Sequence, residues 1–273
     1  MKPAPFAYIR PETQDEALSA LAEHGDDALV LAGGLSLGAM LNMRLAFAET
    51  VIDINRIPAL NRIERVGENL RTGAMVRQAD ALKSADVSEA APLLRLGLQN
   101  VGHYQTRSRG TLGGSVAHAD PSAEIPLCLA TLDGVVELAS QRGSRRVPAR
   151  EFADTALSTI REPDEMVEAL HWPIHTGAGV AFQEIAQRHG DFAIVAVAAV
   201  IRNETEFSLG FGGVEGVPRV LDGEVGGSIE ETVAAFVDEL DAMDDPRASA
   251  EYRIGVARHL GAQTLRQAQE LAA

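Results

Sequence analysis

Two glycine pairs, Gly33-Gly34 and Gly113-Gly114, have the residue types and spacing best suited to ligand chemistry in this sequence. Each pair stands between an apolar run and a stretch that can begin a helix. Glycine lets the backbone turn tightly and approach a ligand without a Cβ atom in the way. The first amides of a helix lack partners within the helix, and the positive end of the helix dipole favours an anion. We therefore predict that each pair forms a turn that suits a pyrophosphate.

The first pair belongs to the run LAGGLSLGAML at Leu31–Leu41, in which Ser36 can cap a helix or donate to a phosphate oxygen. Taken alone, this run also fits a plain turn between a strand and a helix. It matches neither the G-x-G-x-x-G fingerprint nor a P-loop, since no lysine follows it. The first pair by itself therefore leaves a nucleotide site and a structural turn both open.

The second pair lies in GTLGGS, among polar residues that leave further alternatives open. Arg107 and Arg109 are either phosphate partners or solvated loop charges. His103 and His118 are either proton carriers or structural residues. Glu124 either accepts a hydrogen bond from a sugar hydroxyl or simply stabilises the start of a helix.

No set of side chains suited to acid–base, nucleophilic or metal chemistry stands out. The hydrolase elbow, the H-E-x-x-H zinc motif and paired C-x-x-C motifs are absent from the sequence. The single cysteine, Cys128, cannot supply a disulfide framework, a four-cysteine zinc site or an iron–sulfur cluster, and we expect it to be a buried small hydrophobe. We therefore predict no catalytic residue and no metal ligand in this chain, and expect a bound cofactor to do the chemistry.

The composition narrows the class of protein further. The chain has 273 residues, enough for two domains, and 46% of them are hydrophobic, as in a globular protein. Its net charge of −15 argues against nucleic-acid binding, which needs a basic face. No run approaches the roughly 18 apolar residues of a membrane helix, and the first residues lack a signal pattern. We therefore expect a cytoplasmic protein without a membrane span.

The elements around the first pair predict a compact unit of about 55 residues. Thr13 and Glu16 form a capping-box pattern at the start of a helix that ends at His24. Strands over Ala28–Ala32 and Thr50–Ile54 flank the glycine pair and a helix over Ser36–Leu45, as in a βαβ unit.

The rest of the chain predicts further sheets and helices. One hairpin is expected from Arg62–Val66 with Leu70–Ala74, and a second from Gly134–Ala139 with Arg145–Val147. A further strand is expected over Met166–Trp172. Helices are expected over Arg77–Ser84, Ser88–Val101 and Pro121–Leu132. Beyond a glycine cluster at His175–Gly179 we expect three strands, over Val180–Ala186, Ala193–Arg202 and Glu206–Gly212, then helices over Ile229–Leu240 and Ala248–Ala272. The predicted domains are 1–175, with lobes of about 1–56 and 57–175, and 176–273.

Together, the two turns and their surroundings make the sequence resemble the FAD-binding medium subunit of molybdenum hydroxylases. The resemblance is to the carbon monoxide dehydrogenase medium-subunit type, within the xanthine dehydrogenase family. The resemblance covers nearly the whole chain. It is carried by EALSALAEHGDDALVLAGG, VIDINRIPAL, VGHYQTRSRGTLGGSVAHADPSAE and AFQEIAQRHGDFAIVAVAAVI. It implies an α+β fold, in which a two-lobed FAD-binding domain of the PCMH type precedes a smaller α+β domain with a three-stranded antiparallel sheet.

The resemblance also implies which residues bind FAD. The first turn would wrap the pyrophosphate with Ala32, Gly33, Gly34, Leu35, Ser36 and Leu37. The other lobe would hold the pyrophosphate and ribityl region with Thr111, Gly114, Ser115 and Ala117, and Glu124 would meet ribityl or ribose hydroxyls. Gly102, Val167, Gln183, Asp191 and Phe192 would lie near the flavin ring. An aromatic ring at Phe192 can cover a flavin face and exclude water.

Two positions depart from the pattern of the family. Leu35 replaces the polar residue of AGGQS, which removes a side-chain hydrogen bond but leaves the backbone contacts. Gln183 stands where some relatives place a lysine, and a neutral amide stabilises an anionic reduced flavin less than a lysine does. We therefore expect the flavin potential to differ from that of such relatives.

The role implied by the resemblance is an electron relay. A large subunit with the molybdenum cofactor oxidises the substrate, a small subunit with 2Fe-2S clusters passes the electrons on, and FAD on this chain delivers them to an acceptor. The expected assembly is a dimer of heterotrimers, and the acceptor stays open between NAD, oxygen, a quinone and another carrier. The alternatives are a stand-alone FAD-dependent oxidase or reductase and a flavin-free scaffold subunit. The lack of a flavin-attachment motif and the intact turns count against them.

Overall fold

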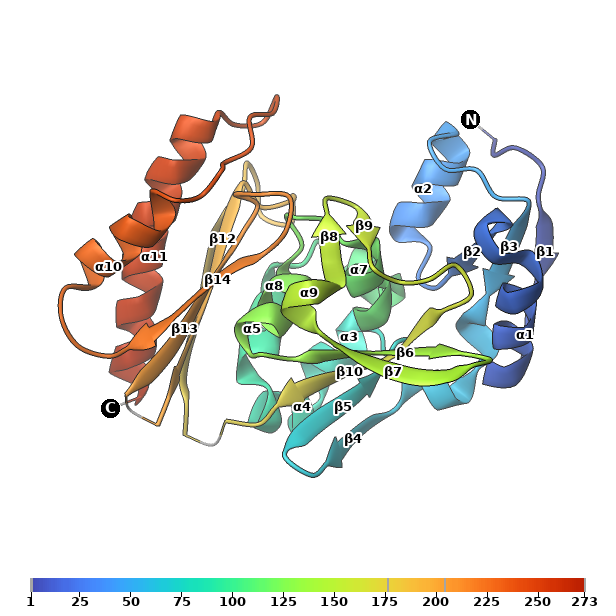
Figure 1. The fold of residues 1–273 in the computed structure, drawn as a ribbon, viewed down its shortest axis with the longest axis horizontal. Helices are drawn as coiled ribbons and strands as arrows, with labels where there is room; N and C mark the ends of the chain where they lie inside the picture. Colours follow the sequence, from blue (N-terminus) through green and yellow to red (C-terminus); the bar gives the residue numbers. More distant parts are fainter. Residues whose placement is uncertain (1, 176, 204, 273) are drawn as a thin grey trace.

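Three hydrophobic clusters follow one another through the computed structural model, which describes residues 2–175, 177–203 and 205–272 (Figure 1). The smallest cluster belongs to an N-terminal lobe, the largest to a middle lobe and the third to a C-terminal unit. Each part combines a sheet with helices, so the predicted α+β class is confirmed.

The N-terminal lobe is built on a small parallel sheet with the strand order β1 (Ala7–Ile9), β3 (Thr50–Asp53) and β2 (Ala28–Leu31). Its helices and 3-10 turns are α1 (Gln14–His24), η1 (Gly25–Asp27), α2 (Leu35–Met43), η2 (Ile54–Arg56) and η3 (Pro58–Asn61). The predicted capping box of Thr13 and Glu16 starts α1, and the βαβ unit is present with β1 as an additional strand. β2 pairs only with β3 among the described residues, so its other edge is open.

The middle lobe contains a five-stranded antiparallel sheet that includes both predicted hairpins. The strands lie in the order β4 (Ile63–Val66), β5 (Asn69–Gly73), β10 (Met166–Pro173), β6 (Val135–Ser140) and β7 (Gly143–Pro148). A small ribbon of β8 (Ala153–Thr155) and β9 (Ser158–Thr159) stands beside the sheet. Trp172 of β10 is fully buried, and its indole donates to Thr72 Oγ1 at 3.0 Å, which fixes β10 against β5.

The middle lobe also contains seven helices in the part of the chain that the structure describes. They are α3 (Gln78–Lys83), α4 (Ala85–Ala90), α5 (Pro92–Asn100), α6 (Tyr104–Arg109), α7 (Leu112–His118), α8 (Glu124–Thr131) and α9 (Ala149–Phe152). The helix expected from Pro121 begins three residues later, because Pro121 and Ser122 form a turn. The Pro121 carbonyl accepts from the amide of Gly213 at 2.7 Å, and the amide of Ser122 donates to Asp120 Oδ1 at 2.9 Å.

The C-terminal unit is an antiparallel sheet covered on one face by two helices (Figure 1). Its strands lie in sequence order as β11 (Gly179–Ile185), β12 (Val195–Arg202), β13 (Glu206–Gly212) and β14 (Arg219–Glu224), and its helices are α10 (Ile229–Val237) and α11 (Ala250–Ala272). The expected sheet of three strands therefore has four. The short run of β14 is mostly polar or partly exposed, so it lacks the apolar signal of its neighbours.

The opposite face of this sheet packs on the middle lobe rather than standing apart from it. Alternate β12 residues, Ala196, Ala198 and Val200, belong to the same cluster as Leu94 of α5 and Leu127 of α8. The intervening residues of β12 face α11. The C-terminal unit therefore completes the core of the middle lobe, whatever boundary is drawn near residue 175.

Candidate functional site

A cavity of about 650 Å³ lies between the N-terminal lobe and the middle lobe. β2 and α2 form one wall, α7 and the start of α8 form another, and Gly190–Phe192 from the C-terminal unit reach one end. Its volume lies within the range of about 300–1,000 Å³ that is usual for small-molecule sites. A single elongated ligand can therefore touch all three parts of the fold.

The two glycine turns meet at this cavity. A Cβ atom at Gly33 would lie only 2.5 Å from the carbonyl oxygen of Arg109 and 3.0 Å from Cα of Gly110. A Cβ atom at Gly114 would lie 3.5 Å from Cβ of Ala32. The turns therefore pack backbone against backbone, which only glycine permits at position 33 without displacement.

A chain of polar contacts, which we call the Asn55–Arg77 bridge, holds the turns together. Asn55 Nδ2 donates to the Ala32 carbonyl at 2.8 Å, and Arg77 Nη2 donates to Asn55 Oδ1 at 2.5 Å. Arg77 Nη1 donates in turn to the carbonyl of Arg109. Asp53 accepts from the Asn55 amide at 2.9 Å and so orients the asparagine. The bridge links the end of β2 to the residue before the second turn.

The N-terminus of α2 faces the cavity without a side-chain cap. Gly34 is the N-cap residue with φ +77°, a conformation that favours glycine, and no side chain accepts from the first amides. The helix begins at Leu35, so Ser36 lies inside its first turn and does not cap it. The amides of the first turn therefore remain available to an anionic ligand. In the second turn, by contrast, Thr111 Oγ1 accepts from the amide of Gly114 at 3.0 Å.

One buried carboxyl group lines the cavity. Glu124, the first residue of α8, lines the cavity with only 7% of its surface exposed. Burial raises the pKa of Glu124 to about 8, and the nearby Glu184 and Asp120 carboxylates add to the effect. Glu124 is therefore mostly protonated at neutral pH and can donate a hydrogen bond to a ligand. Burial likewise raises the pKa of Glu184 to about 7.

One buried polar atom in the cavity wall has no partner among the described residues. Gln78 is 5% exposed, and its Oε1 accepts no hydrogen bond from the described part of the protein. Buried polar atoms are usually paired, so this atom is an exception among the residues of the cavity wall. Gly110 makes room for this side chain, because a Cβ atom there would lie 2.5 Å from Gln78 Oε1.

The C-terminal unit contributes the segment Gly190–Phe192 to the cavity wall. Gly190, with φ +85°, packs against the ring of His103, and a Cβ atom there would lie 2.7 Å from that ring. Asp191 and Phe192 follow at the cavity, and Phe192 is 58% exposed. Val167 lies at a β-bulge of β10, where the register against β6 shifts, and it also lines the cavity. A bulge of this kind re-aims the backbone and side chain locally.

Fifteen of the sixteen residues predicted from the sequence line this one cavity. They are Ala32, Gly33, Gly34, Leu35, Ser36, Leu37, Gly102, Thr111, Gly114, Ser115, Ala117, Glu124, Val167, Asp191 and Phe192. Gln183 does not line the cavity, because side chains of β11 alternate between the two faces of the sheet and Gln183 lies on the face that is covered by α11. Its Nε2 donates to Gln267 Oε1 of α11 at 2.9 Å, while its neighbours Phe182 and Val180 pack toward the middle lobe.

The sequence reasoning missed several other residues of the cavity wall. They include Leu29, Val30, Met40, Ile54, Gln78, Thr106, Arg161 and Met166. The apolar members read as ordinary core residues in the sequence. Arg161 stands alone in a polar turn, where an arginine is usually solvated, so no pattern singled it out. His118, which the sequence left open, lines the cavity, whereas Arg107 donates to the carbonyls of Val101 and Gly102 at 2.7 and 2.9 Å.

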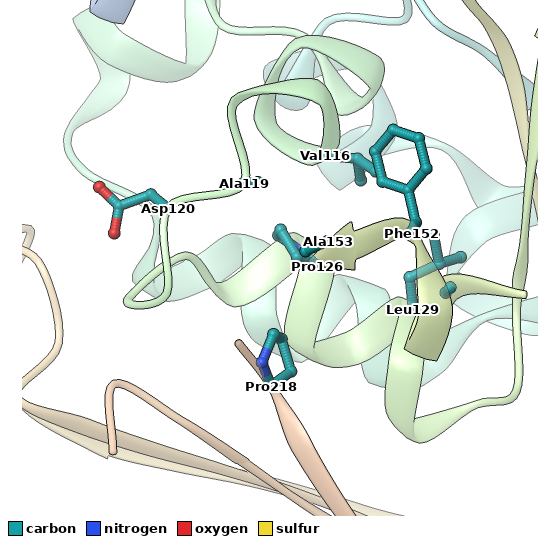
Figure 2. Close-up of a pocket in the computed structure, with 9 residues that line it drawn as sticks. Val116, Ala119, Asp120, Pro126, Leu129, Phe152, Ala153 and Pro218 are labelled. Atoms are coloured by element: carbon teal, nitrogen blue, oxygen red, sulfur yellow. The ribbon is translucent and has the colours of Figure 1, made fainter. Parts of the chain in front are cut away.

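A second cavity, of about 20 Å³, lies among α7, α8 and α9 (Figure 2). Its lining is almost wholly apolar, and the Asp120 carboxylate extends away from Pro126 and Leu129. This space suits a water molecule at most and is a packing void between helices. Cys128 of α8 is fully buried, as predicted, and burial raises the pKa of its thiol.

None of the helices that the structure describes has the length and apolar character needed to cross a membrane. No three His, Cys, Asp or Glu side chains of the described residues gather where they could hold a metal ion.

Comparison with known proteins gives consistent matches over this chain. Residues 4–175 match the family described as the FAD binding domain in molybdopterin dehydrogenase. The 6-hydroxypseudooxynicotine dehydrogenase complex subunit alpha of Paenarthrobacter nicotinovorans is 34% identical over 98% of this chain and 96% of its own length. The carbon monoxide dehydrogenase medium chain of Hydrogenophaga pseudoflava is 32% identical over 94% of both chains.

Solved structures show the same similarity in three dimensions. A carbon monoxide dehydrogenase structure from Hydrogenophaga pseudoflava superposes with a TM-score of 0.96 at 29% identity, covering 100% of both chains. Quinoline 2-oxidoreductase from Pseudomonas putida 86 superposes with a TM-score of 0.90 at 31% identity, covering 100% of this chain and 99% of that chain.

Proposed function

Because this chain belongs to the family of FAD-binding domains of molybdopterin dehydrogenases, we propose that its large cavity holds one FAD with the pyrophosphate between the two glycine turns. The chain is an FAD-binding medium subunit of the molybdenum hydroxylase type, and its part in the enzyme is electron transfer. The observation that carries the placement of FAD is the contact of the two turns at one cavity.

The charges of the cavity indicate how a diphosphate is held. Asp120, Glu124 and Asp191 are the acidic residues of the lining, whereas Arg161 is its one arginine among the described residues. A doubly negative diphosphate therefore depends on backbone N–H donors, which the uncapped first turn of α2 supplies. Leu35 adds no polar side chain here, so its amide rather than its side chain serves the ligand.

The remaining residues orient the cofactor. When bound, FAD supplies the reversible acceptance and release of electrons. Protonated Glu124 donates to a ribityl or ribose hydroxyl from the buried start of α8. Val167 and Asp191 border the ring, and Phe192 covers one side of it and excludes water. Gln183 takes no direct part, because its amide is engaged with α11.

The partner subunits follow from the same premise. The relatives are named as medium chains or complex subunits, and this chain is likewise one subunit of a larger enzyme. We propose that it joins an iron–sulfur small subunit and a large subunit with the molybdenum cofactor, as a dimer of heterotrimers. In that assembly the exposed Phe192 end of the cavity is where electrons pass to or from the flavin.

The variant Gly114→Asp tests the proposed site. A Cβ atom at Gly114 would lie 2.6 Å from Thr111 Oγ1, so aspartate crowds the turn and adds a negative charge beside the diphosphate. We expect the purified wild-type chain to be yellow and to release FAD on denaturation, and the variant to be colourless. Gly255→Asp in α11 is the matched control, because no atom lies within 4 Å of its Cβ position.

The outcomes separate the proposed function from its alternatives. Full retention of FAD by Gly114→Asp contradicts the proposed site. A wild-type chain that takes up no FAD indicates the flavin-free scaffold. Turnover of an organic substrate by the chain alone indicates a stand-alone oxidase or reductase. Co-purification with chains that carry iron–sulfur and molybdenum signals supports the heterotrimer.

A further inference from the structure

Arg161 is the one arginine among the described residues that line the large cavity. It lies in the turn between β9 and β10, and its side chain is only partly exposed. Burial lowers its pKa from the ordinary value, although an arginine stays charged at any physiological pH. No carboxylate lies within 4 Å of this guanidinium in residues 2–175, 177–203 and 205–272. A charged group thus borders the cavity without a salt bridge among the described residues, although Glu165, Asp164 and Asp26 lie near enough to raise its pKa.

The turn holds Arg161 in a fixed direction. Its Nη1 donates to the carbonyls of Glu162 at 2.8 Å, Pro163 at 3.3 Å and Glu165 at 2.6 Å. The buried carboxylate of Glu165 is itself held by Arg145 Nε at 2.6 Å and Nη2 at 2.8 Å, and it accepts from the amide of Glu162. Side chains fixed by such supporting contacts give precise ligand geometry.

The other nitrogen atoms of Arg161 are free for a ligand. Neither Nε nor Nη2 donates a hydrogen bond to any residue that the structure describes. Neither atom is among the fully buried polar atoms that lack a partner, so both reach accessible space. Since the residue lines the cavity, this space belongs to the proposed FAD site.

Arg161 lies near the start of β2. Asp26, two residues before β2, is close enough to influence its pKa. The Gly33 turn follows the other end of β2, about 16 Å further along at roughly 3.3 Å per residue. Leu29 and Val30, on the open edge of β2, line the cavity along this length.

We propose that Arg161 binds the adenosine end of FAD and makes this chain select a flavin dinucleotide over a flavin mononucleotide. The inference rests on the proposed function, which puts the pyrophosphate at the glycine turns and the flavin ring beside Phe192. The rest of the dinucleotide then extends along the open edge of β2 to Arg161. A guanidinium can stack on a purine face or donate to its ring nitrogens, and the open strand edge can pair with the edge of the base.

The test compares ligand affinities of the full-length chain after removal of its flavin. Arg161→Leu removes the guanidinium, Arg161→Lys keeps a positive charge and a donor, and Arg95→Leu makes the same change at an exposed arginine of α5. We expect Arg161→Leu to bind FAD about 10- to 100-fold more weakly, as for loss of a charged hydrogen bond or stack, with a smaller loss in Arg161→Lys. We expect Arg95→Leu to match the wild type. Equal melting temperatures of the variants show that the turn still folds.

Further measurements separate the ends of the cofactor. FMN lacks adenosine, so its affinity should be the same in Arg161→Leu and wild type, and the visible spectrum of bound FAD should not shift. If FMN binds too weakly to measure, ADP is used to displace FAD, and its affinity should fall by the same factor as that of FAD. An unchanged FAD affinity, an equal loss for FMN or a shifted flavin spectrum overturns the inference. A wild-type chain that binds no FAD contradicts the proposed function instead.

Discussion

Gly33→Ala tests the contact of the two glycine turns directly. The added Cβ would lie 2.5 Å from the carbonyl oxygen of Arg109, so the turns must separate by about half an ångström or more. That carbonyl also accepts from Arg77, so the displacement strains the Asn55–Arg77 bridge as well. Overpacking of this kind typically costs about 1–3 kcal/mol. If the cost falls on the FAD-bound form, the dissociation constant rises about 5- to 150-fold.

The assay is FAD binding to the deflavinated full-length chain, followed by flavin fluorescence, with thermal unfolding measured in parallel. Gly38→Ala is the matched control, because it makes the same change five residues later in α2, where no atom lies within 4 Å of the Cβ position. Alanine replaces glycine favourably inside a helix, so the control should bind FAD normally and melt no lower than wild type. Normal FAD affinity in Gly33→Ala, or an equal loss in Gly38→Ala, would refute the reasoning.

Three further perturbations test other parts of the structure. Arg77→Leu removes the two contacts that Arg77 makes in the bridge, so FAD affinity and the melting temperature should both fall. Each contact is worth about 1.5–3 kcal/mol for a charged donor at full strength, and less here because Arg77 is only half-buried. An unchanged affinity in the same fluorescence assay would show that the bridge does not position the turns. Burial raises the pKa of Glu124 to about 8 and of Glu184 to about 7, so the folded chain keeps protons that the unfolded chain releases above about pH 4.5. The stability that these protonated groups contribute is therefore lost as pH rises toward 8. The double variant Glu124→Gln, Glu184→Gln lacks both titrating groups, so its melting temperature should change less between pH 5 and pH 9 than that of the wild type. The same slope of melting temperature against pH in both proteins would contradict the pKa assignments. A chain cut after residue 175 should aggregate or bind a hydrophobic dye, because the β12 face that covers α5 and α8 is gone; a stable monomer by light scattering would show that the first 175 residues fold alone.

The glycine turns were predictable because their signal is local. A glycine pair between an apolar run and a helix start defines a backbone geometry whatever surrounds it, and the family resemblance supplied the other predicted residues that line the cavity. The hairpins and α1 were predictable for the same reason, since turn residues and a capping box lie within a few positions of each other. These elements match the structure closely.

The errors came from information that is not local. Gln183 and Glu184 differ by one position, and only the packing of β11 between two cores decides which of them faces the middle lobe. β14 and the late start of α8 depend on pairing with distant segments, β13 and Gly213. Arg161 reaches the cavity because the turn before β10 passes the start of β2, which no sequence spacing encodes. The predicted domain boundary near residue 175 separates parts of the chain that share a hydrophobic core. Residues of β12 belong to two hydrophobic cores, one in the middle lobe and one beneath α11.

The open edge of β2 has a consequence for the chain before it acquires its cofactor. Unpaired strand edges attract other strands and promote self-association. Here Leu29 and Val30 line the cavity, and the free edge of their strand has no neighbouring strand among the described residues. A dinucleotide lying along this edge would shield it much as an extra strand would, so newly made chains without flavin are the ones at risk of sticking to each other. Flavin supply during synthesis would then govern the yield of usable subunit as well as its colour.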